Sequence, residues 1–340
     1  MFETPSHRLE VARRTAKRLR GARSIAVSTH VNGDGDGWGS ACALAHHFGG
    51  SDCDVRLLAA TPIPERFRFL LPEGVEPYDP DEGGIEALRT ADVQIVVDAS
   101  ERRRLGEFAP HYLPDRTVVI DHHAVATEEI EAALALVDPD AAATAELVYD
   151  VLLQTGDPVD APTACALYVG LVTDTGSFRY SNSTPQAHRT AAALIEAGAD
   201  PGALYRPLFA NLNVGELGTL QAALAEMQRD EEHGITWTVL DLDASRRFGA
   251  LEEYEPVIEH LRNLTGTQVA ILFRELEGGE VKISLRSIGP ADVAAVARSF
   301  GGGGHKKAAG ATIAGSVAEV TTLVLAACRA ALAGPAQTRS

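Results

Sequence analysis

One short segment near the N-terminus carries an imidazole, two carboxylates and several glycines. In STHVNGDGDGWGS, residues 28–40, His30 is followed by Asp34 and Asp36. Imidazole nitrogens and carboxylate oxygens are metal ligands, so the segment could supply part of a metal-dependent hydrolase site. The glycines do not have the spacing of a dinucleotide-binding loop. A calcium-binding loop that began at Asn32 would need a glutamate where Ala43 stands.

More carboxylates and imidazoles follow other apolar runs of the first half of the chain. They are Asp98, Asp121, His122, His123 and Asp174. A single aspartate in such a place is usually a helix cap or a turn residue. Several such places in one domain predict a shared site, because converging carboxylates repel one another strongly unless cations lie between them.

The elements that must position these residues form an alternating pattern. Predicted strands are Ile25–Ser28, Asp54–Leu58, Val93–Val97 and Val118–Ile120. Predicted helices are Ser40–Phe48, Glu128–Leu136, Thr144–Gln154 and residues 184–199. Such alternation predicts an α/β domain with a mainly parallel sheet flanked by helices. Ligands of such sheets bind at the carboxyl ends of the strands, where the candidate residues stand.

A second set of elements predicts a smaller C-terminal α/β domain. Its predicted strands are Ile235–Leu240, Gln268–Phe273 and Val281–Leu285, and its predicted helix is Pro256–Asn263. A glycine-rich loop follows, GGGGHKKAAG at residues 301–310. We therefore expect a catalytic domain over residues 1–202, a helical connector over 203–227 and a substrate-binding domain over 228–335.

The composition limits the partners of the chain. Its 340 residues are 45% hydrophobic and carry a net charge of −17, which argues against a broad basic surface for long nucleic acid. No apolar run has the length of a membrane span, and none follows the N-terminal charges as in a secretory signal. The four cysteines form no CxxC pair, which predicts reduced thiols in a cytoplasmic protein.

The triplet at residues 121–123 and the motifs around it resemble the DHH phosphoesterase superfamily. The other motifs stand in the same order as in that superfamily and are His30-x3-Asp34-x-Asp36, Val97–Asp98 and Asp174–Thr175–Gly176–Ser177–Phe178. GGGGHKKAAG and Ser284–Leu285–Arg286–Ser287 resemble the two signatures of the DHHA1 substrate-binding domain. The resemblance extends over about residues 20–315 and implies an active site in a cleft between the two domains.

Size and arrangement resemble the NrnA-type group, whose members are bifunctional oligoribonucleases and phosphatases of 3′-phosphoadenosine 5′-phosphate (pAp). The resemblance implies hydrolysis of pAp and of short oligoribonucleotides such as pApA, without long nucleic acid or membrane as partners. It also suggests a homodimer. Alternatives are a cyclic di-AMP phosphodiesterase, a RecJ-like exonuclease on single-stranded DNA, a family II pyrophosphatase and a non-catalytic nucleotide-binding module.

The family pattern implies two Mn²⁺ ions, with Mg²⁺ or another divalent ion as an alternative. One would be bound by His30, Asp34 and Asp98, and the other by Asp36, Asp98, His122 and Asp174. Asp98 would bridge the ions, which together would activate a water molecule. His123 is implied to act on the phosphate, and Asp121 is expected to support a ligand and not to bind metal.

The C-terminal signatures imply the residues that bind substrate. They are Arg286, Gly303, Gly304, His305 and Lys306. Consecutive glycines let backbone N–H groups approach an anion, and arginine binds phosphate through two parallel hydrogen bonds. One departure from the family pattern is Gly33, where members often have proline; we expect this change to loosen the loop without loss of a metal ligand.

Overall fold

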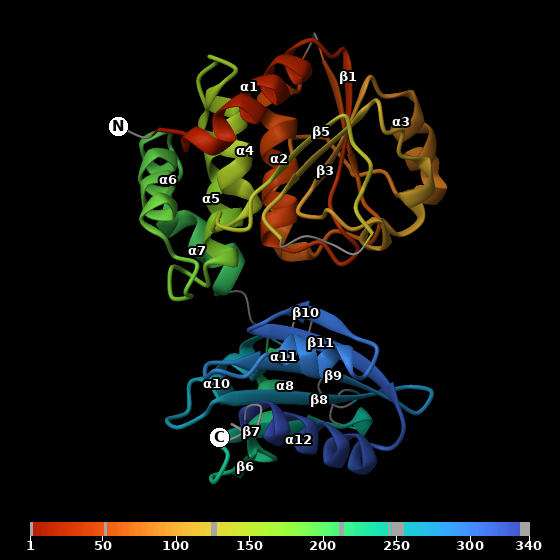
Figure 1. Cartoon of the computed structure of the whole chain (residues 1–340), viewed down its shortest axis with the longest axis vertical. Helices are drawn as coiled ribbons and strands as arrows, with labels where there is room; N and C mark the ends of the chain where they lie inside the picture. The colour runs from red at the N-terminus through yellow and green to blue at the C-terminus, as the bar shows by residue number, and fades with distance from the viewer. Residues whose placement is uncertain are drawn as a thin grey trace, which may run out of the picture. The chain divides into compact units, whose positions relative to one another are not determined.

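A computed structural model describes residues 3–50, 53–123, 128–210, 214–243, 246 and 255–333; for residues 255, 256 and 305 it describes the backbone alone. The chain divides into two compact units, Met1–Asn211 and Leu212–Ser340 (Figure 1). Each unit is described by itself. None of the described helices is long and apolar enough to cross a membrane.

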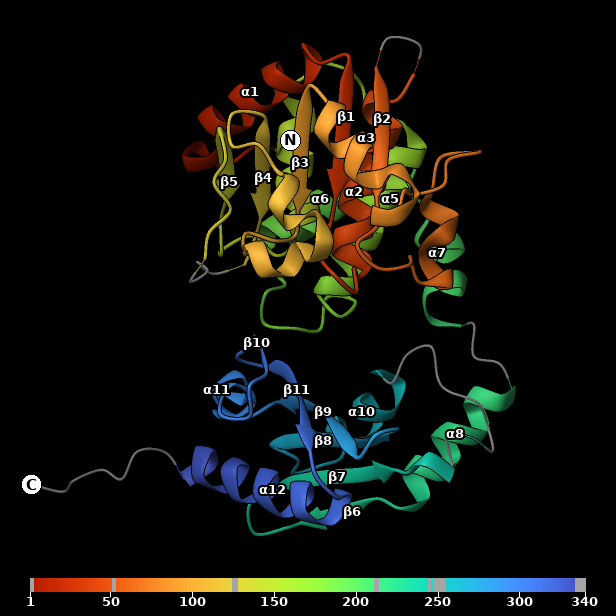
Figure 2. The same cartoon turned by 90° about the vertical axis from the view of Figure 1, so that its right-hand side faces the viewer.

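The N-terminal unit is built on a sheet whose neighbouring strands all run parallel. Its strands are β1 (Ser24–Ser28), β2 (Asp54–Leu58), β3 (Val93–Val97), β4 (Thr117–Asp121) and β5 (Leu134–Val137). Figure 2 shows them side by side in the order β2-β1-β3-β4-β5. The side chains of β3 and β4 are buried throughout, as expected for strands with helices on both faces. The predicted parallel sheet is confirmed.

The strand order reverses at β1. The chain passes from β1 to β2 on one side and then crosses back to β3 on the other side of β1. Open parallel sheets bind ligands outside the carboxyl ends of the strands at such a reversal. His30 follows β1 and Asp98 follows β3, so the topology places both residues at the expected binding edge.

Helices cover both faces of this sheet (Figure 1). On one side lie α1 (Ser6–Arg20), α2 (Gly35–Phe48), α4 (Thr144–Leu153) and α5 (Ala161–Asp174), with α6 (Pro185–Glu196) and α7 (Pro201–Phe209) beyond them. On the other side lie α3 (Ile85–Thr90) and the short helical segment η3 (Arg102–His111). Side chains of β1 alternate between the two faces of the sheet. Ile25 and Val27 belong to the hydrophobic core that includes α2 and α5, and Ala26 belongs to the core that includes α3 and η3. The connections also contain η1 (Glu65–Leu70) and η2 (Pro80–Gly84).

Two glycines let α2 and α5 pack with their backbones close together. A Cβ atom at Gly39 would lie 2.5 Å from the carbonyl oxygen of Ala166. A Cβ atom at Gly170 would lie 2.8 Å from Asp36 Oδ1. Larger residues would push the helices apart. Since Asp36 stands in the first turn of α2 and α5 ends at Asp174, this packing brings two predicted ligands together.

The predicted helix over Glu128–Leu136 is wrong. Its last three residues, 134–136, belong to β5, which pairs in parallel with β4. Leu134 and Leu136 join the core while Ala135 is exposed, which is the alternation of a strand. Pairing with β4 therefore outweighs the modest helix propensity of this segment. The apolar run at residues 164–172 lies within α5, and Asp174 is the last residue of that helix.

The C-terminal unit contains a mixed sheet between two layers of helices. Its strands are β6 (Gln228–Asp230), β7 (Ile235–Leu240), β8 (Val269–Leu276), β9 (Glu280–Ser287), β10 (Gly303–His305) and β11 (Ala308–Ala314). They lie in the order β10-β11-β9-β8-β7-β6, and among them only β7 and β8 pair in parallel. The helices are α8 (Val214–Ala225), α10 (Glu255–Arg262), α11 (Val293–Arg298) and α12 (Val317–Ala333).

Most elements predicted for this unit agree with the structure within a few residues, since β7, β8, β9 and α10 all occur. Ala270 and Leu272 of β8 pack with α8 and α10, whereas Ile271 and Phe273 pack with α11 and α12. The glycine-rich segment differs from the prediction of a loop. It forms β10, which pairs with β11 in an antiparallel hairpin.

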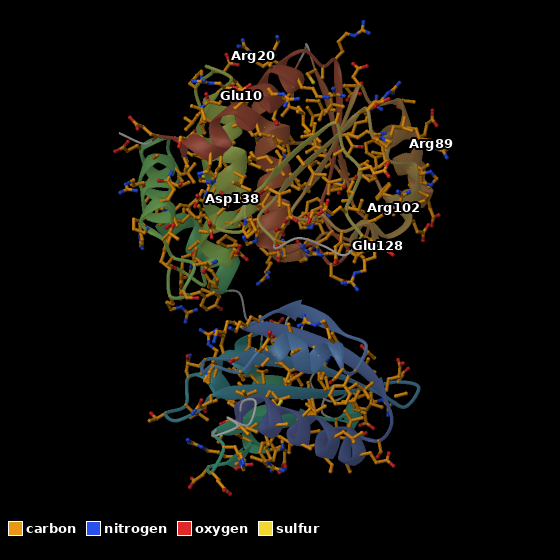
Figure 3. All side chains as sticks on the ribbon, viewed as in Figure 1. Glu10, Arg20, Arg89, Arg102, Glu128 and Asp138 are labelled. Atoms are coloured by element: carbon orange, nitrogen blue, oxygen red, sulfur yellow. The ribbon has the colours of Figure 1, made fainter. Side chains whose placement is uncertain are left out.

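A buried arginine ties α1 to the segment that follows β5. Arg8 Nε donates to Asp138 Oδ2 at 2.5 Å, and Arg8 Nη1 donates to Glu146 Oε1 at 2.6 Å and Asp150 Oδ2 at 3.2 Å. All four side chains are at least nine-tenths buried; Asp138 is labelled in Figure 3. Burial raises the pKa of Asp150 to about 6 against the opposing effects of Thr4 and Arg8. One guanidinium therefore offsets the repulsion among three carboxyl groups.

We expect Arg8→Ala to destabilise the N-terminal unit strongly, by about 3–5 kcal/mol, because it leaves buried carboxylates without their cation. Arg14→Ala is the matched control, since Arg14 is exposed on the same helix, and its effect should stay within about 0.5 kcal/mol. Urea denaturation followed by circular dichroism measures both. Equal unfolding midpoints for the two variants would contradict the role given to Arg8.

Candidate metal centre

The carboxyl ends of β1, β3 and β4 meet the first turn of α2 and the last turn of α5. Three groups of side chains there have ligand atoms within 4.8 Å of one another and could hold a metal ion. The groups are His30–Asp34–Asp98, Asp36–His122–Asp174 and Asp98–His122–His123. The structure therefore brings together all six residues that the sequence predicts as metal ligands.

The first group surrounds the imidazole of His30. Its Nε2 atom lies 3.8 Å from Asp34 Oδ2 and 3.2 Å from Asp98 Oδ2. The other ring nitrogen, Nδ1, lies 2.8 Å from the carbonyl oxygen of Val31, to which it donates. Nε2 is buried and has no partner with hydrogen-bond geometry in the part of the chain that the structure describes. Nε2 thus faces two carboxylates, as in a metal ligand.

The second group surrounds the imidazole of His122. Its Nε2 atom lies 3.5 Å from Asp174 Oδ2 and 3.9 Å from Asp36 Oδ2. The same atom lies 3.7 Å from Asp98 Oδ1. One oxygen of Asp98 therefore faces His30 and the other faces His122, an arrangement that suits a ligand shared by two ions.

The backbone and α4 fix the orientation of Asp98 and Asp36. Asp98 has φ +62°, a left-handed conformation that aspartate tolerates better than most residues. Thr144 Oγ1 donates to Asp98 Oδ1 at 3.0 Å. The backbone N–H groups of Thr144 and Ala145 donate to the two oxygens of Asp36 at 2.6 and 2.9 Å. The positive end of α4 thereby holds a carboxylate that has repelling neighbours.

The segment after Asp174 has an unusual backbone. Ser177 and Phe178 have φ values of +58° and +61°, which cost free energy in residues other than glycine. Asn182 Nδ2 donates to Asp174 Oδ2 at 3.3 Å and to the carbonyl oxygen of Ala142 at 2.9 Å. This conformation returns the chain so that Asn182 holds the carboxylate of Asp174 beside His122.

Without a metal ion, the crowded carboxylates of the centre repel one another, and this shifts the pKa values of several groups. Burial and the charge of Asp98 raise the pKa of Asp36 well above its usual value. Burial also raises the pKa of Asp174 to about 7, against the opposing charge of His122. Burial lowers the pKa values of His30 and His122, but the carboxylates around them raise these to about 10 and about 9. The metal-free centre therefore retains protons on groups that would have to lose them to bind metal.

His123 takes part in a separate chain of contacts. Its Nδ1 atom lies 2.7 Å from Asp121 Oδ1 and 3.5 Å from Asp98 Oδ1. Arg104 Nη1 donates to His123 Nε2 at 3.1 Å. Asp121 is fully buried and, among the described residues, belongs to none of the groups that could hold metal. It contacts His123, and the supporting part expected of it stays a prediction.

Gly33 lies in the loop before Asp34, where its neighbours leave no room for a side chain. A Cβ atom there would lie 2.7 Å from both Thr29 Cγ2 and Trp38 Nε1. Proline, frequent at this place in the family pattern, would need these neighbours to move. The structure thus gives a packing reason for glycine, while the expected looseness of the loop stays a prediction.

The residues predicted to bind substrate lie in the C-terminal unit. Gly303 and Gly304 belong to β10, Lys306 is exposed in the turn after it, and Arg286 lies on β9 opposite Ala308 of β11. The side chain of His305 is outside the described part of the chain. Gly304 has φ +132°, and a Cβ atom there would lie 2.5 Å from the carbonyl oxygen of Ala308, so the hairpin itself requires this glycine. A Cβ atom at Gly303 would meet nothing within 4 Å, so there is open space beside this residue.

Sequence reasoning missed three residues that support the centre: Thr144, Asn182 and Arg104. Thr144 opens a predicted helix and could have been suspected as a capping residue, but not as a partner of Asp98. Arg104 stands last in a run of three arginines, and nothing in the sequence distinguishes it from the other two.

Comparison with known proteins agrees with this geometry. Residues 24–171 match the DHH family, N-terminal domain, and residues 251–333 match the DHHA1 domain. The bifunctional oligoribonuclease and PAP phosphatase NrnA of Thermus thermophilus is 32% identical over 292 residues, which cover 86% of this chain and 84% of that protein. This chain belongs to the DHH/DHHA1 phosphoesterase superfamily. The NrnA of Bacillus subtilis is 28% identical over 85% of this chain and 89% of that protein.

Similarity to one solved structure is evidence for the fold and not for the function. An exopolyphosphatase-related protein from Bacteroides fragilis superposes with a TM-score of 0.89 at 23% identity, over 95% of this chain and 97% of that one. The two-domain α/β fold predicted from the sequence is confirmed by this likeness and by the family matches.

The residues present fit a divalent cation. Carboxylates and neutral imidazoles suit Mn²⁺, Mg²⁺ or a related ion better than a metal that prefers thiolates. The buried and unpartnered Nε2 of His30 is explained if it binds metal. Bound cations would also offset the burial and the repulsion that together raise the pKa values of Asp36 and Asp174.

We expect Mn²⁺ to raise the melting temperature of the metal-free protein, and to raise it more at pH 7.5 than at pH 6. His30, His122 and Asp174, with pKa values of about 10, 9 and 7 in the absence of metal, must release protons before they bind it. Protons compete better at low pH, so affinity and stabilisation both fall as the pH falls. Thermal denaturation with and without Mn²⁺ measures the effect. An equal shift at both pH values, or none, would contradict this account of the centre.

Proposed function

We propose that this chain is a divalent-metal-dependent hydrolase that cleaves short oligoribonucleotides such as pApA and removes the 3′-phosphate of pAp. The observation that carries the proposal is the shared carboxylate of Asp98, which faces two groups of potential metal ligands at the sheet reversal. Relatives named as oligoribonucleases and PAP phosphatases support the choice of substrates.

The proposed cofactor is a pair of Mn²⁺ ions. His30, Asp34 and Asp98 would hold one, and Asp36, Asp98, His122 and Asp174 would hold the other. When bound, such ions would lower the pKa of an attacking water and stabilise charge on phosphate oxygens. Mg²⁺ is the alternative cofactor, because the donor set also suits it.

The protein's own groups prepare the site for that chemistry. Thr144 and the N-terminus of α4 fix the oxygens of Asp98 and Asp36. Val31 fixes the ring of His30 through Nδ1, which keeps Nε2 available as a ligand. Asp121 holds His123 beside Asp98. Held in this way, the ligands need little rearrangement when substrate arrives.

The C-terminal unit would bind the part of the substrate remote from the reacting phosphate. Arg286 would offer a guanidinium for a phosphate, and the open space beside Gly303 would let an anion approach. Gly304, His305 and Lys306 would complete this subsite. The division at residues 202 and 228, a site between the domains and a homodimer all stay predictions.

We expect hydrolysis of pAp and pApA in the presence of Mn²⁺, and its loss in EDTA. Asp98→Asn is the sharpest variant, because asparagine also tolerates φ +62° and can accept the hydrogen bond from Thr144. It removes only the charge. Turnover should fall by about 100-fold or more, since even outer partners of metal ligands are worth about 10–100-fold. Chromatography of released phosphate and AMP measures it.

Asp115→Asn makes the same chemical change at an exposed position and should keep full activity. Cyclic di-AMP serves as the alternative substrate. Turnover of neither pAp nor pApA by protein that carries metal would reject the proposed function, and turnover of cyclic di-AMP alone would replace it with the alternative.

A further inference from the structure

A guanidinium lies at the edge of the candidate metal centre, against the imidazole of His123. Arg104 stands in the first turn of η3, and its carbonyl oxygen accepts a hydrogen bond from Val31 N at 2.7 Å, next to His30. Contact with His30 holds the pKa of Asp34 below its usual value, and the positive charge of Arg104 lowers it further. Arg104 is thus part of the electrostatic environment of the centre.

Arg104 differs from other arginines of this unit in its partners. Arg8 contacts three carboxylates, and Arg103 pairs with Glu101 at 2.7 Å. Among the described residues, Arg104 has no carboxylate within ion-pair distance, and its side chain has one hydrogen-bond partner, His123. A guanidinium has five N–H donors in a planar fork that matches phosphate. Most of the donors of this half-buried cation are therefore available to an anionic ligand.

The contact with Arg104 also fixes the state of His123. Arginine only donates hydrogen bonds, so His123 Nε2 must accept and its hydrogen must reside on Nδ1. Nδ1 then donates to Asp121 Oδ1 at 2.7 Å. Both ring nitrogens of His123 are engaged in this arrangement. Two hydrogen bonds thus connect Asp121, His123 and Arg104, and the chain of contacts ends on the guanidinium.

We propose that Arg104 binds a non-bridging oxygen of the substrate phosphate at the metal centre, and that Asp121 and His123 position its guanidinium for that contact. The inference rests on the proposed function, because the phosphate belongs to the substrate of the same site. It assigns the N-terminal unit a phosphate-binding cation of its own, in addition to those of the C-terminal unit. It also makes His123 a positioning residue for Arg104.

The two preceding arginines provide a matched control. Arg102 lies beside Glu128, both labelled in Figure 3, and its backbone N–H donates to the carbonyl oxygen of Glu128 at 3.1 Å. The side chain of Arg103 is 69% exposed and pairs with Glu101. Arg103→Ala therefore removes the same charge one residue away without touching the centre.

The test is calorimetric titration of inorganic phosphate into Mn²⁺-supplied full-length protein. We expect Arg104→Ala to weaken phosphate binding by about tenfold or more, as for the loss of one charge-assisted hydrogen-bonded pair. Arg104→Lys keeps the charge but not the planar fork of N–H donors, so its affinity for phosphate should lie between those of the wild type and Arg104→Ala. Arg103→Ala should bind like the wild type. Equal affinity for phosphate in the wild type and the Arg104 variants would overturn the inference.

Kinetics with pAp separate this inference from the proposed function. Arg104→Ala should raise KM or lower kcat, and guanidinium ion added to it should restore part of the loss, an effect that a merely structural residue would not show. Arg104-dependent phosphate binding without any turnover by the wild type would reject the proposed function alone. Normal turnover and normal phosphate affinity in Arg104→Ala would reject the inference alone. If Arg104→Ala fails to fold, Arg104→Lys decides the matter by the same titration.

Discussion

The repulsion among the aspartates around Asp98 is the constraint on which the rest of the N-terminal unit depends. Asp36 and Asp98 are almost fully buried, and Asp174 lies close to both. Two imidazoles offset part of that charge only when they carry protons. A divalent cation offsets it while those protons leave, so the arrangement is better suited to the metal-bound state than to the metal-free one.

One segment, residues 138–145, holds much of this arrangement in place. Asp138 is anchored by the buried Arg8, and the carbonyl oxygens of Ala141 and Ala142 contact His122 and Asn182. The end of the segment, at Thr144 and the residue after it, holds Asp36 and Asp98. Hydrogen bonds thereby connect α1 to the predicted ligands, although, in the part of the chain that the structure describes, no residue of α1 belongs to a group that could hold metal.

The sequence predicts the candidate ligands better than it predicts their support. Strand ends followed by aspartate and histidine are local patterns, and His30, Asp98 and His122 could be identified from them. The close packing at Gly170 and the hydrogen bonds from Thr144 depend on residues far apart in the chain, so no local pattern contains them. The segment at residues 128–136 shows the same limit, because its strand character comes from pairing with β4 and not from its own helix-forming residues.

The central claim is that Asp98 is shared by two cations. Electron paramagnetic resonance of the Mn²⁺-loaded protein, together with metal analysis, tests it most directly. The account predicts two Mn²⁺ per chain with the spectrum of a magnetically coupled pair, and loss of that coupling in Asp98→Asn. One ion per chain, or two ions with uncoupled spectra in the wild type, would contradict it.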